Sequence, residues 1–390
     1  MSIHILRGQN QIGGNIIEIA TNHTKILLDA GLELDDFGGQ SLPKIQGLFD
    51  YAGYDAIIIS HYHGDHIGLV YHAHKDIPIY LGEASYNIIL AADCYRRIKT
   101  FTPKGFLHHR QTITIGDISV TPYLCDHSAF DSYMLFCEAD GETILYTGDF
   151  RSNGRKSFSA LLNALPKSVD KLLCEGTTLS RENYVAVSEQ ELEKRAADLF
   201  RTTAGPVFVL QASMNIDRIV TMYRAAKQSN RIFLEELYMA EITTAAGKNI
   251  PNPNFDDVYA FITSPAKYSM LTKYQHKAGK SFIASRPFVM CVRNSMLRYL
   301  KSLSQKISFE NGLLVYSFWS GYRETESMKS FLSECKKMGL HIITLHTSGH
   351  ADVNTLKKLI DTVNPKTLLP VHTESAEKFK EIAPTLVIEK

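Results

Sequence analysis

The chain has 390 residues, of which 44% are hydrophobic and 21% are charged, and its formal net charge is +1. This near-neutral balance excludes a protein that coats nucleic acid through bulk positive charge, although it leaves room for a local basic groove. The length suits two or three domains, or one large core with an insertion. We expect neither a signal peptide nor a membrane segment, because no run reaches the roughly 18 apolar residues that span a bilayer.

The six cysteines are scattered along the chain, and no CxxC pair occurs among them. Such spacing favours free, buried thiols in a reducing compartment over a framework of disulfides. We therefore predict a cytoplasmic protein.

The first 150 residues alternate short β-rich runs with Gly and Asp. The run at 57–59 is apolar on every residue, which indicates a sheet covered on both faces. We therefore predict layered α/β/α packing in this part. Strands are expected within 15–20, 25–31, 56–60, 77–82, 113–123, 133–139 and 143–149.

A regular βαβ pattern begins near residue 188. Ser188 and Glu191 form a capping-box signature ahead of a helix. A helix is expected after each strand that follows, which is typical of a compact parallel α/β unit. These strands are expected at 207–210, 231–237, 288–291 and 313–318.

The last part of the chain returns to strands that end in histidine. The runs 341–350 and 367–372 flank a helix that is expected from about 352. The predicted organisation is therefore a first domain in two parts, 1–190 and 341–390, with a second domain at 191–340 inserted between them.

The motif HYHGDH at 61–66 carries metal-binding groups at the end of a predicted strand. His61 and His63 stand two positions apart, which would place them about 200° apart on a helix, so the helical HExxH zinc motif is excluded. They converge only on extended or loop backbone. Gly64 lets the chain turn so that Asp65 and His66 point back, and loops at strand ends are where α/β sheets place their sites.

Four ligands in one loop seldom surround a single ion well, but two ions can share them. Two metal ions about 3.5–4 Å apart hold a bridging hydroxide and stabilise both the entering and the leaving oxygen of a displacement. Such a pair needs ligands from elsewhere in the chain. Three further predicted strands lead into His127, Asp149 and His372.

Together with GGN at 13–15 and ILLDAG at 26–31, these residues resemble the metallo-β-lactamase fold. The insertion, followed by HTSGHAD and LLPVHTE, resembles the β-CASP family of nucleases, most closely ribonuclease J-like RNA-processing enzymes. The resemblance implies an αββα metallo-β-lactamase sandwich with an inserted β-CASP parallel α/β domain. Glu175, His350 and His372 fit the three additional motifs of that family.

The resemblance also implies roles for the site residues. His61, His63 and His127 would hold one divalent ion, Asp65, His66 and His372 would hold the other, and Asp149 would bridge them. Imidazole and carboxylate ligands suit Zn²⁺, with Mn²⁺ or Mg²⁺ as alternatives.

The catalytic residues implied by the resemblance are Asp65, His350 and Glu175. His350 is expected to donate a proton to the leaving oxygen; the alternative is that it only steadies an oxygen of the scissile phosphate. Glu175 is expected to orient a ligand histidine through a hydrogen bond, or else to be a plain structural carboxylate.

Two short segments are expected to bind substrate phosphate. A helix N-terminus favours anions, but Ser-Gly pairs are commonly plain turns, so the resemblance carries this prediction. The segments are Thr347, Ser348 and Gly349, and Ser320, Gly321, Tyr322 and Arg323.

Basic and aromatic residues interleave in the insertion, at Lys267, Tyr268, Lys273, Tyr274, Lys277 and Lys280. Such a mixture can follow an RNA backbone and stack bases, and it is equally typical of a solvated helix face. His72 and His74 repeat the HxH spacing, but we expect them on a helix after the metal loop, as surface residues.

The function predicted from the sequence is that of a two-metal ribonuclease, endonucleolytic or 5′-exonucleolytic, in which a metal-bridging hydroxide attacks the phosphodiester. A DNA nuclease of the same family is an alternative opposed only by His372, since DNA-repair members usually have an apolar residue there. A thioester or lactone hydrolase seldom needs such an inserted domain, and a non-catalytic RNA-binding scaffold would not need every ligand. The expected partner is RNA. We expect the C-terminal domain of full ribonuclease J to be lacking, and a homodimer is an alternative to a single chain.

Overall fold

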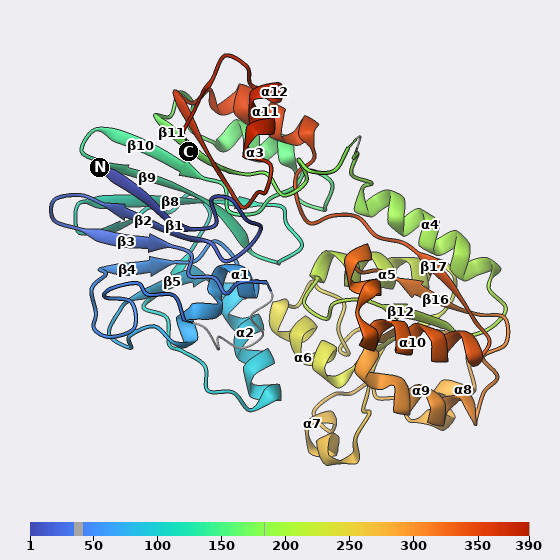
Figure 1. Cartoon of the computed structure of the whole chain (residues 1–390). Helices are drawn as coiled ribbons and strands as arrows, with labels where there is room; N and C mark the ends of the chain where they lie inside the picture. Colours follow the sequence, from blue (N-terminus) through green and yellow to red (C-terminus); the bar gives the residue numbers. More distant parts are fainter. Residues whose placement is uncertain (35–41, 183, 390) are drawn as a thin grey trace. The chain divides into compact units, whose positions relative to one another are not determined.

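The computed structural model of the chain describes residues 1–34, 42–182 and 184–389. Its contacts divide the chain into two compact units. Unit 1 comprises Met1–Asp93, Ile98–Ala186 and Gly349–Lys390, and unit 2 comprises Cys94–Arg97 and Val187–Ser348 (Figure 1). The segment Val187–Ser348 therefore folds as a unit of its own, and in the sequence it separates two parts of unit 1.

Unit 1 is built on two sheets. The first has the order β1-β2-β3-β4-β5-β6, with β1 (Ser2–Arg7), β2 (Ile16–Ala20), β3 (Lys25–Leu28), β4 (Ala56–Ile58), β5 (Ile79–Gly82) and β6 (Gly105–Leu107). The second has the order β19-β18-β11-β10-β9-β8-β7, with β7 (Ile113–Ile115), β8 (Ile118–Cys125), β9 (Ser132–Ala139), β10 (Glu142–Tyr146), β11 (Lys171–Glu175), β18 (Thr367–Val371) and β19 (Val387–Ile388).

Each sheet combines an antiparallel part with a parallel part. In the first sheet β1, β2 and β3 pair antiparallel, whereas β3, β4, β5 and β6 run parallel. In the second sheet β7 to β10 are antiparallel, and β10, β11, β18 and β19 run parallel. The carboxyl ends of the parallel strands meet at one edge of their sheet, which is where ligand sites form in α/β proteins.

The apolar strands are buried because both of their faces are covered. Alternate residues of a strand point to opposite faces: Leu135 of β9 packs with Ile58 of β4 between the two sheets, whereas Phe136 packs with Leu359 of α11 (Val353–Val363) on the outer face. Helices α3 (Phe158–Ala164) and α12 (Phe379–Ile382) cover the same outer face. The predicted burial on both faces is confirmed.

Two helices lie beside the first sheet, α1 (Gly64–Ile67) and α2 (Glu83–Arg96) (Figure 1). With the helices on the outer face of the second sheet, unit 1 has the αββα layering that the sequence predicted. No helix in the described ranges has both the length and the apolar character needed to cross a lipid bilayer.

The prediction that His72 and His74 lie on a helix is wrong. Helix α1 ends at Ile67, and the 3₁₀ turn Gly68–Tyr71 ends before His72. The backbone N–H of His74 donates to Leu48 O at 2.7 Å instead of to a residue of a helical turn. A hydrogen bond to a distant loop thus replaces the helical bond that the local sequence would permit.

Unit 2 contains a parallel sheet of order β14-β13-β15-β12-β16-β17, so the predicted parallel α/β unit is confirmed. Its strands are β12 (Val207–Leu210), β13 (Ile232–Glu236), β14 (Val258–Phe261), β15 (Phe288–Val292), β16 (Gly312–Tyr316) and β17 (Leu340–Thr344). Its helices are α4 (Glu189–Thr202), α5 (Ile216–Gln228), α6 (Leu237–Ala246), α7 (Tyr268–Leu271), α8 (Lys280–Ala284), α9 (Leu297–Ser304) and α10 (Glu326–Lys337). The sequence did not predict β14.

The beginning and the end of unit 2 are tied together by a buried ion pair. Ser188 caps α4 as predicted, its Oγ accepting from Glu191 N at 3.1 Å. Arg218 of α5 is fully buried and donates twice to Glu189, at 2.9 and 3.1 Å. The same guanidinium donates to Thr347 O at 3.5 Å. One side chain therefore bonds both to the first turn of α4 and to the segment that leaves unit 2.

A buried carboxyl group lies in the unit 2 sheet, on the strand next to the edge strand β14. Glu235 of β13 is fully buried, its Oε2 accepts from Thr243 Oγ1 at 2.8 Å, and its Oε1 has no hydrogen-bond partner in the described part of the chain. Burial raises the pKa of Glu235 to about 8. The folded state therefore favours the protonated acid, which needs fewer hydrogen bonds than the carboxylate.

This pKa predicts a stability that falls as pH rises. The unfolded glutamic acid has a pKa of about 4.3, so the contribution of Glu235 is complete below that pH and is lost as pH rises through about 8. Glu235→Gln, which cannot ionise, should be about 3 kcal/mol more stable than wild type at pH 7. Thermal unfolding of the full chain, followed between about pH 5 and pH 8, measures the difference.

Glu310→Gln is the matched control, because Glu310 is exposed in the same unit. It should follow the wild type at every pH. A constant difference between Glu235→Gln and wild type across the pH range would contradict the raised pKa.

Candidate metal centre

The candidate ligands stand where strands of unit 1 end. His61 and His63 follow β4, and His127 follows β8. Asp149 and His372 follow β10 and β18, which flank β11 in the parallel part of the second sheet. The sheets therefore bring to one edge residues that are up to about 300 positions apart in the chain, as strand ends do in α/β proteins.

The predicted ligands form two groups that share Asp149, which also belongs to a third group with Glu175, His350 and His372. Within each group the candidate ligand atoms lie within 4.8 Å of one another. The first group is His61, His63, His127 and Asp149, and the second is Asp65, His66, Asp149 and His372. Every residue predicted to hold a metal thus lies in one of these groups.

Asp149 Oδ2 lies at the centre of both groups. It is 3.2 Å from His66 Nε2, 3.7 Å from His61 Nε2, and 3.8 Å from the Nε2 atoms of both His127 and His372. Asp65 Oδ2 lies 3.2 Å from His372 Nε2. The nitrogen and oxygen lone pairs of these residues therefore surround two points, and the carboxylate of Asp149 takes part in both.

Four of the converging atoms are buried without hydrogen bonds, which makes the site suitable for metal ions. His61 Nε2, His66 Nε2 and both oxygens of Asp149 have no hydrogen-bond partner among the described residues. Buried polar atoms are normally paired, because an unpaired one loses its bonds to water. Imidazole nitrogens and carboxylate oxygens are the usual ligands of divalent transition-metal ions in proteins, so the residues present fit such ions.

Four of the ligand histidines are held by their other ring nitrogen. An Nδ1–H that donates outward leaves the lone pair of Nε2 facing the centre, which fixes both tautomer and ring orientation. The acceptors are Asp29 Oδ2 for His66 at 2.7 Å, Gly349 O for His127 at 2.5 Å, Thr177 Oγ1 for His372 at 2.8 Å and Ser60 Oγ for His61 at 3.0 Å.

Two of these acceptors are hydroxyl groups, and each of them donates in turn to a buried carboxylate. Ser60 Oγ donates to Asp29 Oδ2 at 2.8 Å, and Thr177 Oγ1 donates to Glu175 Oε2 at 2.7 Å. Behind His61 and His372 there is therefore a chain of imidazole, hydroxyl and carboxylate. Glu175 reaches a ligand histidine through Thr177, which is the geometry needed for an orienting role.

Asp29 is a residue of this site that the sequence reasoning missed. It is fully buried just after β3, with a left-handed backbone at φ 60°, and it accepts hydrogen bonds from Ser60 N and Tyr146 OH, both at 2.7 Å. The signal was present in ILLDAG, where an Asp follows an apolar strand just as Asp149 follows ILYTG. Its short side chain gave no indication of which histidine it would contact.

Burial and neighbouring charges set the protonation of the groups. Burial, together with the adjacent imidazoles, lowers the pKa of His61 and His127 well below the usual range, and burial lowers the pKa of His63 to about 4. Burial would raise the pKa of Asp149, but the imidazoles of His372, His66 and His350 hold it well below its usual value. These are the neutral imidazoles and the ionised carboxylate that bind metal ions. His66 differs, because its burial is outweighed by the carboxylates of Asp149, Asp65 and Asp29, which raise its pKa well above the usual range, so a bound ion would replace its proton.

His350 lies beside the two groups, with its side chain 20% exposed. Its Nδ1 donates to Glu175 Oε2 at 3.1 Å and lies 3.7 Å from Asp149 Oδ2. Burial works against the charged ring, but the carboxylates of Glu175 and Asp149 raise the pKa of His350 to about 9. His350 therefore carries a proton at neutral pH at a position that solvent can reach.

The predicted phosphate-binding residues are divided between the units. Gly349 belongs to unit 1, where its carbonyl holds His127. Thr347 and Ser348 are buried at the end of unit 2, and Ser320, Gly321, Tyr322 and Arg323 form the 3₁₀ turn Ser320–Glu324 of unit 2. The Arg323 guanidinium lies 4.3 Å from the Tyr316 ring and donates to Thr344 Oγ1 at 2.8 Å.

Two family models match the chain. A β-lactamase superfamily domain matches residues 24–211, which include His61 to Glu175. A second model, described as a Zn-dependent metallo-hydrolase RNA specificity domain, matches residues 337–383, which include His350 and His372.

Curated relatives resemble the chain over most of its length. Ribonuclease J of Sinorhizobium meliloti is 22% identical over 90% of the chain, and ribonuclease J of Helicobacter pylori is 25% identical over 95%. The chain spans 64% and 55% of the lengths of these two proteins. A probable RNase of Methanocaldococcus jannaschii is 25% identical, with 94% of the chain and 92% of that protein covered. The resemblance to ribonuclease J-like proteins is confirmed.

The fold is also similar to a solved structure. A crystal structure of a protein of unknown function from Enterococcus faecalis V583 covers 100% of the chain with a TM-score of 0.82 at 22% identity, and the chain covers 97% of that protein. Together with the matched β-lactamase superfamily domain, this similarity confirms the predicted class, a metallo-β-lactamase sandwich with an inserted β-CASP-type α/β domain.

The hydrogen bonds behind the ligands predict that Asp29 controls metal affinity. Asp29→Ala removes the acceptor of His66 and breaks the chain from His61, so the affinity for Zn²⁺ should fall roughly 10–100-fold, as is typical when the partner of a ligand histidine is lost. Competition with a chromophoric chelator measures the affinity, and elemental analysis measures the bound metal.

Asp170→Asn provides the control, because Asp170 bonds Lys366 and Thr143 in the same unit without joining the candidate centre. Asp29→Asn tests the same position with little change in volume. A folded Asp29→Asn or Asp29→Ala chain that binds Zn²⁺ as wild type does would contradict the orienting role.

Proposed function

We propose that the protein is a two-metal phosphodiesterase that hydrolyses RNA. The observation that carries this proposal is the pair of ligand groups that share Asp149, with the proton-bearing His350 beside them. The similarity to ribonuclease J and the matched RNA specificity domain support RNA as the substrate. Zn²⁺ suits the imidazole-rich ligands best, with Mn²⁺ or Mg²⁺ as alternatives.

In this proposal the two groups hold one ion each. His61, His63 and His127 would hold the first, Asp65, His66 and His372 would hold the second, and Asp149 would be shared between them. Two divalent ions, when bound, supply a nucleophile at neutral pH and neutralise charge on the phosphate. The chain itself supplies a buried, oriented set of ligands, which excludes bulk water from the centre.

Acid catalysis is assigned to His350. Its ring carries a proton at neutral pH because Glu175 and Asp149 raise its pKa, and its partial exposure lets it meet a bound phosphodiester. His350 gives that proton to the leaving oxygen, which would otherwise depart as an alkoxide. Glu175 is a positioning residue, since it bonds His350 directly and His372 through Thr177.

We further propose that the two units correspond to the domains predicted at 1–190 with 341–390 and at 191–340. The boundary predicted at 340/341 is shifted, because β17 pairs with β16 and the chain up to Ser348 belongs to unit 2. Unit 2 would supply the phosphate-binding residues Thr347, Ser348 and Ser320–Arg323, and unit 1 would supply Gly349. Preference for a 5′-monophosphate end, a homodimer and a cytoplasmic location stay predictions from the sequence.

Removal of the acid should slow cleavage without unfolding the chain. His350→Ala should lower kcat about 10²–10⁴-fold on a 5′-monophosphorylated RNA, which is the usual contribution of a general acid. His72→Ala is the control, because His72 is an exposed histidine of the same unit. Cleavage at the wild-type rate by His350→Ala would remove His350 from the mechanism.

The same assay separates the alternatives. Single-stranded DNA of the same sequence and a thioester substrate are tested in parallel, and turnover of either in preference to RNA would replace the proposed substrate. RNA labelled at the 5′ end or at the 3′ end distinguishes internal cuts from stepwise release of nucleotides.

Metal removal tests the metal centre directly. Dialysis against a chelator should abolish RNA cleavage, and Zn²⁺ or Mn²⁺ should restore it, because the ions supply the nucleophile in this class of site. Elemental analysis of the purified chain should find about two equivalents of metal, as two-metal sites require. Full activity in a chain that elemental analysis shows to be free of metal would overturn the proposal.

A further inference from the structure

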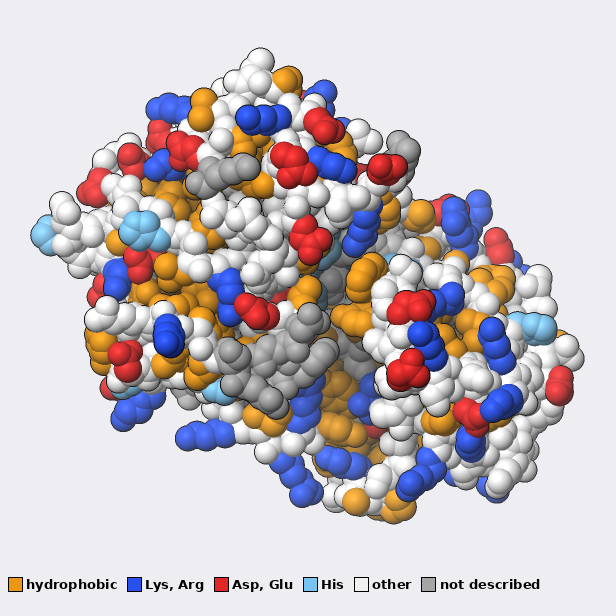
Figure 2. Space-filling view, in the orientation of Figure 1, with side chains coloured by type: hydrophobic (Ala, Val, Ile, Leu, Met, Phe, Trp, Pro, Cys, Tyr) orange, Lys and Arg blue, Asp and Glu red, His pale blue; other side chains and the backbone are white. Residues whose placement is uncertain are grey.

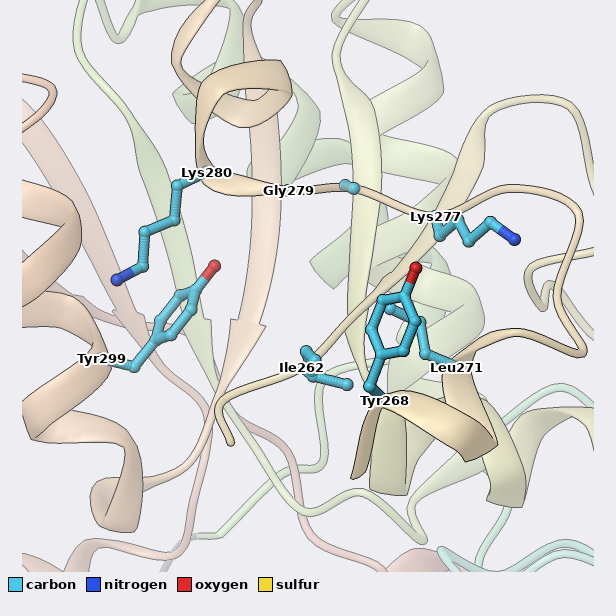
Figure 3. Close-up of a pocket in the computed structure, with 8 residues that line it drawn as sticks. Ile262, Tyr268, Leu271, Lys277, Gly279, Lys280 and Tyr299 are labelled. Carbon is cyan, nitrogen blue, oxygen red and sulfur yellow. The ribbon is translucent and has the colours of Figure 1, made fainter. Parts of the chain in front are cut away.

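Unit 2 contains a pocket at the edge of its parallel sheet. The pocket has a volume of about 370 Å³ and lies beside Ile262, the residue that follows β14 (Figure 3). Its lining includes Ile262, Tyr268, Leu271, Lys277, Lys280 and Tyr299. The pocket therefore lies at the carboxyl end of a strand in a parallel sheet, the usual place for ligands in such sheets.

Backbone hydrogen bonds fix the shape of this pocket. After β14 the chain forms α7 and then returns, so that Ala278 N donates to Ala260 O at 2.8 Å and Ala260 N donates to His276 O at 3.0 Å. The segment that carries Lys277 and Gly279 is thus pinned to β14. Figure 3 shows the rings of Tyr268 and Tyr299 on either side of the pocket, with both hydroxyl groups directed toward this segment.

The two tyrosines offer different surfaces to a ligand. Tyr268 is 61% exposed, which leaves an aromatic face open to solvent. Tyr299 is only 8% exposed, yet its hydroxyl has no hydrogen-bond partner among the described residues. Burial raises the pKa of Tyr299 above its usual value, so the group stays a hydrogen-bond donor at neutral pH. An open ring face and a hydroxyl donor without a partner in the described part of the chain face the same cavity.

The charges that line the pocket are positive. Lys280 Nζ lies 5.2 Å from the centre of the Tyr299 ring and donates to Ser302 Oγ, which holds this cation in place. Lys277 is exposed and has neither an ion pair nor a hydrogen bond within the described ranges, whereas Lys273 nearby is paired with Glu241. No carboxylate belongs to the described lining. Figure 2 shows basic and hydrophobic side chains over the end of unit 2 that carries α7.

This combination fits one class of ligand. A flat aromatic surface suits a planar base, a free ammonium group suits a phosphate, and a hydroxyl donor suits a phosphate or sugar oxygen. Proteins that hold single-stranded nucleic acid use such a mixture, with stacking on aromatic rings and lysines along the backbone. A cavity of this volume has room for about one nucleotide.

We propose that this pocket binds one nucleotide of single-stranded RNA, with its base stacked on Tyr268 and its phosphate paired with Lys277. The inference rests on the proposed function for RNA as the substrate class, and it adds an RNA-holding site whose residues all belong to unit 2, whereas the proposed metal ligands all belong to unit 1. The pocket supplies affinity for the strand and takes no part in the chemistry.

The test measures binding separately from cleavage. A fluorescein-labelled RNA of about 12 nucleotides, within the range that single-strand-binding folds cover, is titrated with the full chain in the presence of a chelator, and anisotropy gives the dissociation constant. Tyr268→Ala should weaken binding about tenfold, while Tyr268→Phe should keep the affinity because the ring remains. Lys277→Ala should weaken binding about threefold and reduce the salt dependence by about one phosphate contact.

Two controls remove comparable groups elsewhere. Tyr51→Ala deletes a tyrosine of unit 1 that is 47% exposed, and Lys248→Ala deletes an exposed lysine of unit 2 without a hydrogen bond or ion pair in the described part of the chain. Both should bind the RNA as wild type does. Thermal melting of each variant checks that the fold is intact.

The outcomes distinguish this inference from the proposed function. If wild type binds and cleaves RNA while Tyr268→Ala and Lys277→Ala bind as tightly as wild type, the pocket inference is overturned and the function stands. If wild type neither binds nor cleaves RNA, both fall. A loss in Tyr268→Ala that Tyr268→Phe does not share supports the pocket, since only the ring distinguishes the two variants.

Discussion

The buried carboxylate of Asp149 is the point on which the organisation of unit 1 depends. A single ionised oxygen, with no hydrogen bond among the described residues, is surrounded at 3.2 to 3.8 Å by the Nε2 atoms of four histidines. A buried charge without compensation would cost several kcal/mol, so such an arrangement is stable only where cations or protonated rings balance it. The residues around it have the chemistry to bind cations. Cation binding would therefore compensate for the free energy lost when so many polar groups are buried.

The layers around the centre follow from the need to hold those histidines still. Each ligand comes from the segment just after a strand or, for Asp65 and His66, from the short helix α1 that follows β4, and the strands are buried on both faces by the second sheet or by helices. A rigid strand fixes the backbone of its last residue, and the Nδ1 hydrogen bonds fix the ring beyond it. Asp29 and Glu175 occupy equivalent places in this scheme, one behind each sheet's histidines, although they are separated by more than a hundred residues in the chain.

Much of the site was predictable because its signals are local. HYHGDH after an apolar strand is a short, dense motif, and the strands that lead into His127, Asp149 and His372 are strongly apolar. The parts that sequence reasoning missed depend on contacts between distant segments. Asp29 is a single carboxylate whose partners, Ser60, His66 and Tyr146, are not adjacent in sequence. The helix expected at His72 is replaced by a backbone hydrogen bond from His74 to Leu48.

The place of β18 in the second sheet has a consequence for how the chain matures as it is synthesised. This strand lies between β11 and β19 and carries His372, yet it is made after the whole of unit 2. The sheet therefore stays open at β11 while residues up to 366 leave the ribosome, and the second ligand group lacks a member during that time. Because Arg218 already joins Glu189 to Thr347, unit 2 can close first. An incompletely synthesised chain would thus carry a finished unit 2 and an incomplete set of candidate metal ligands.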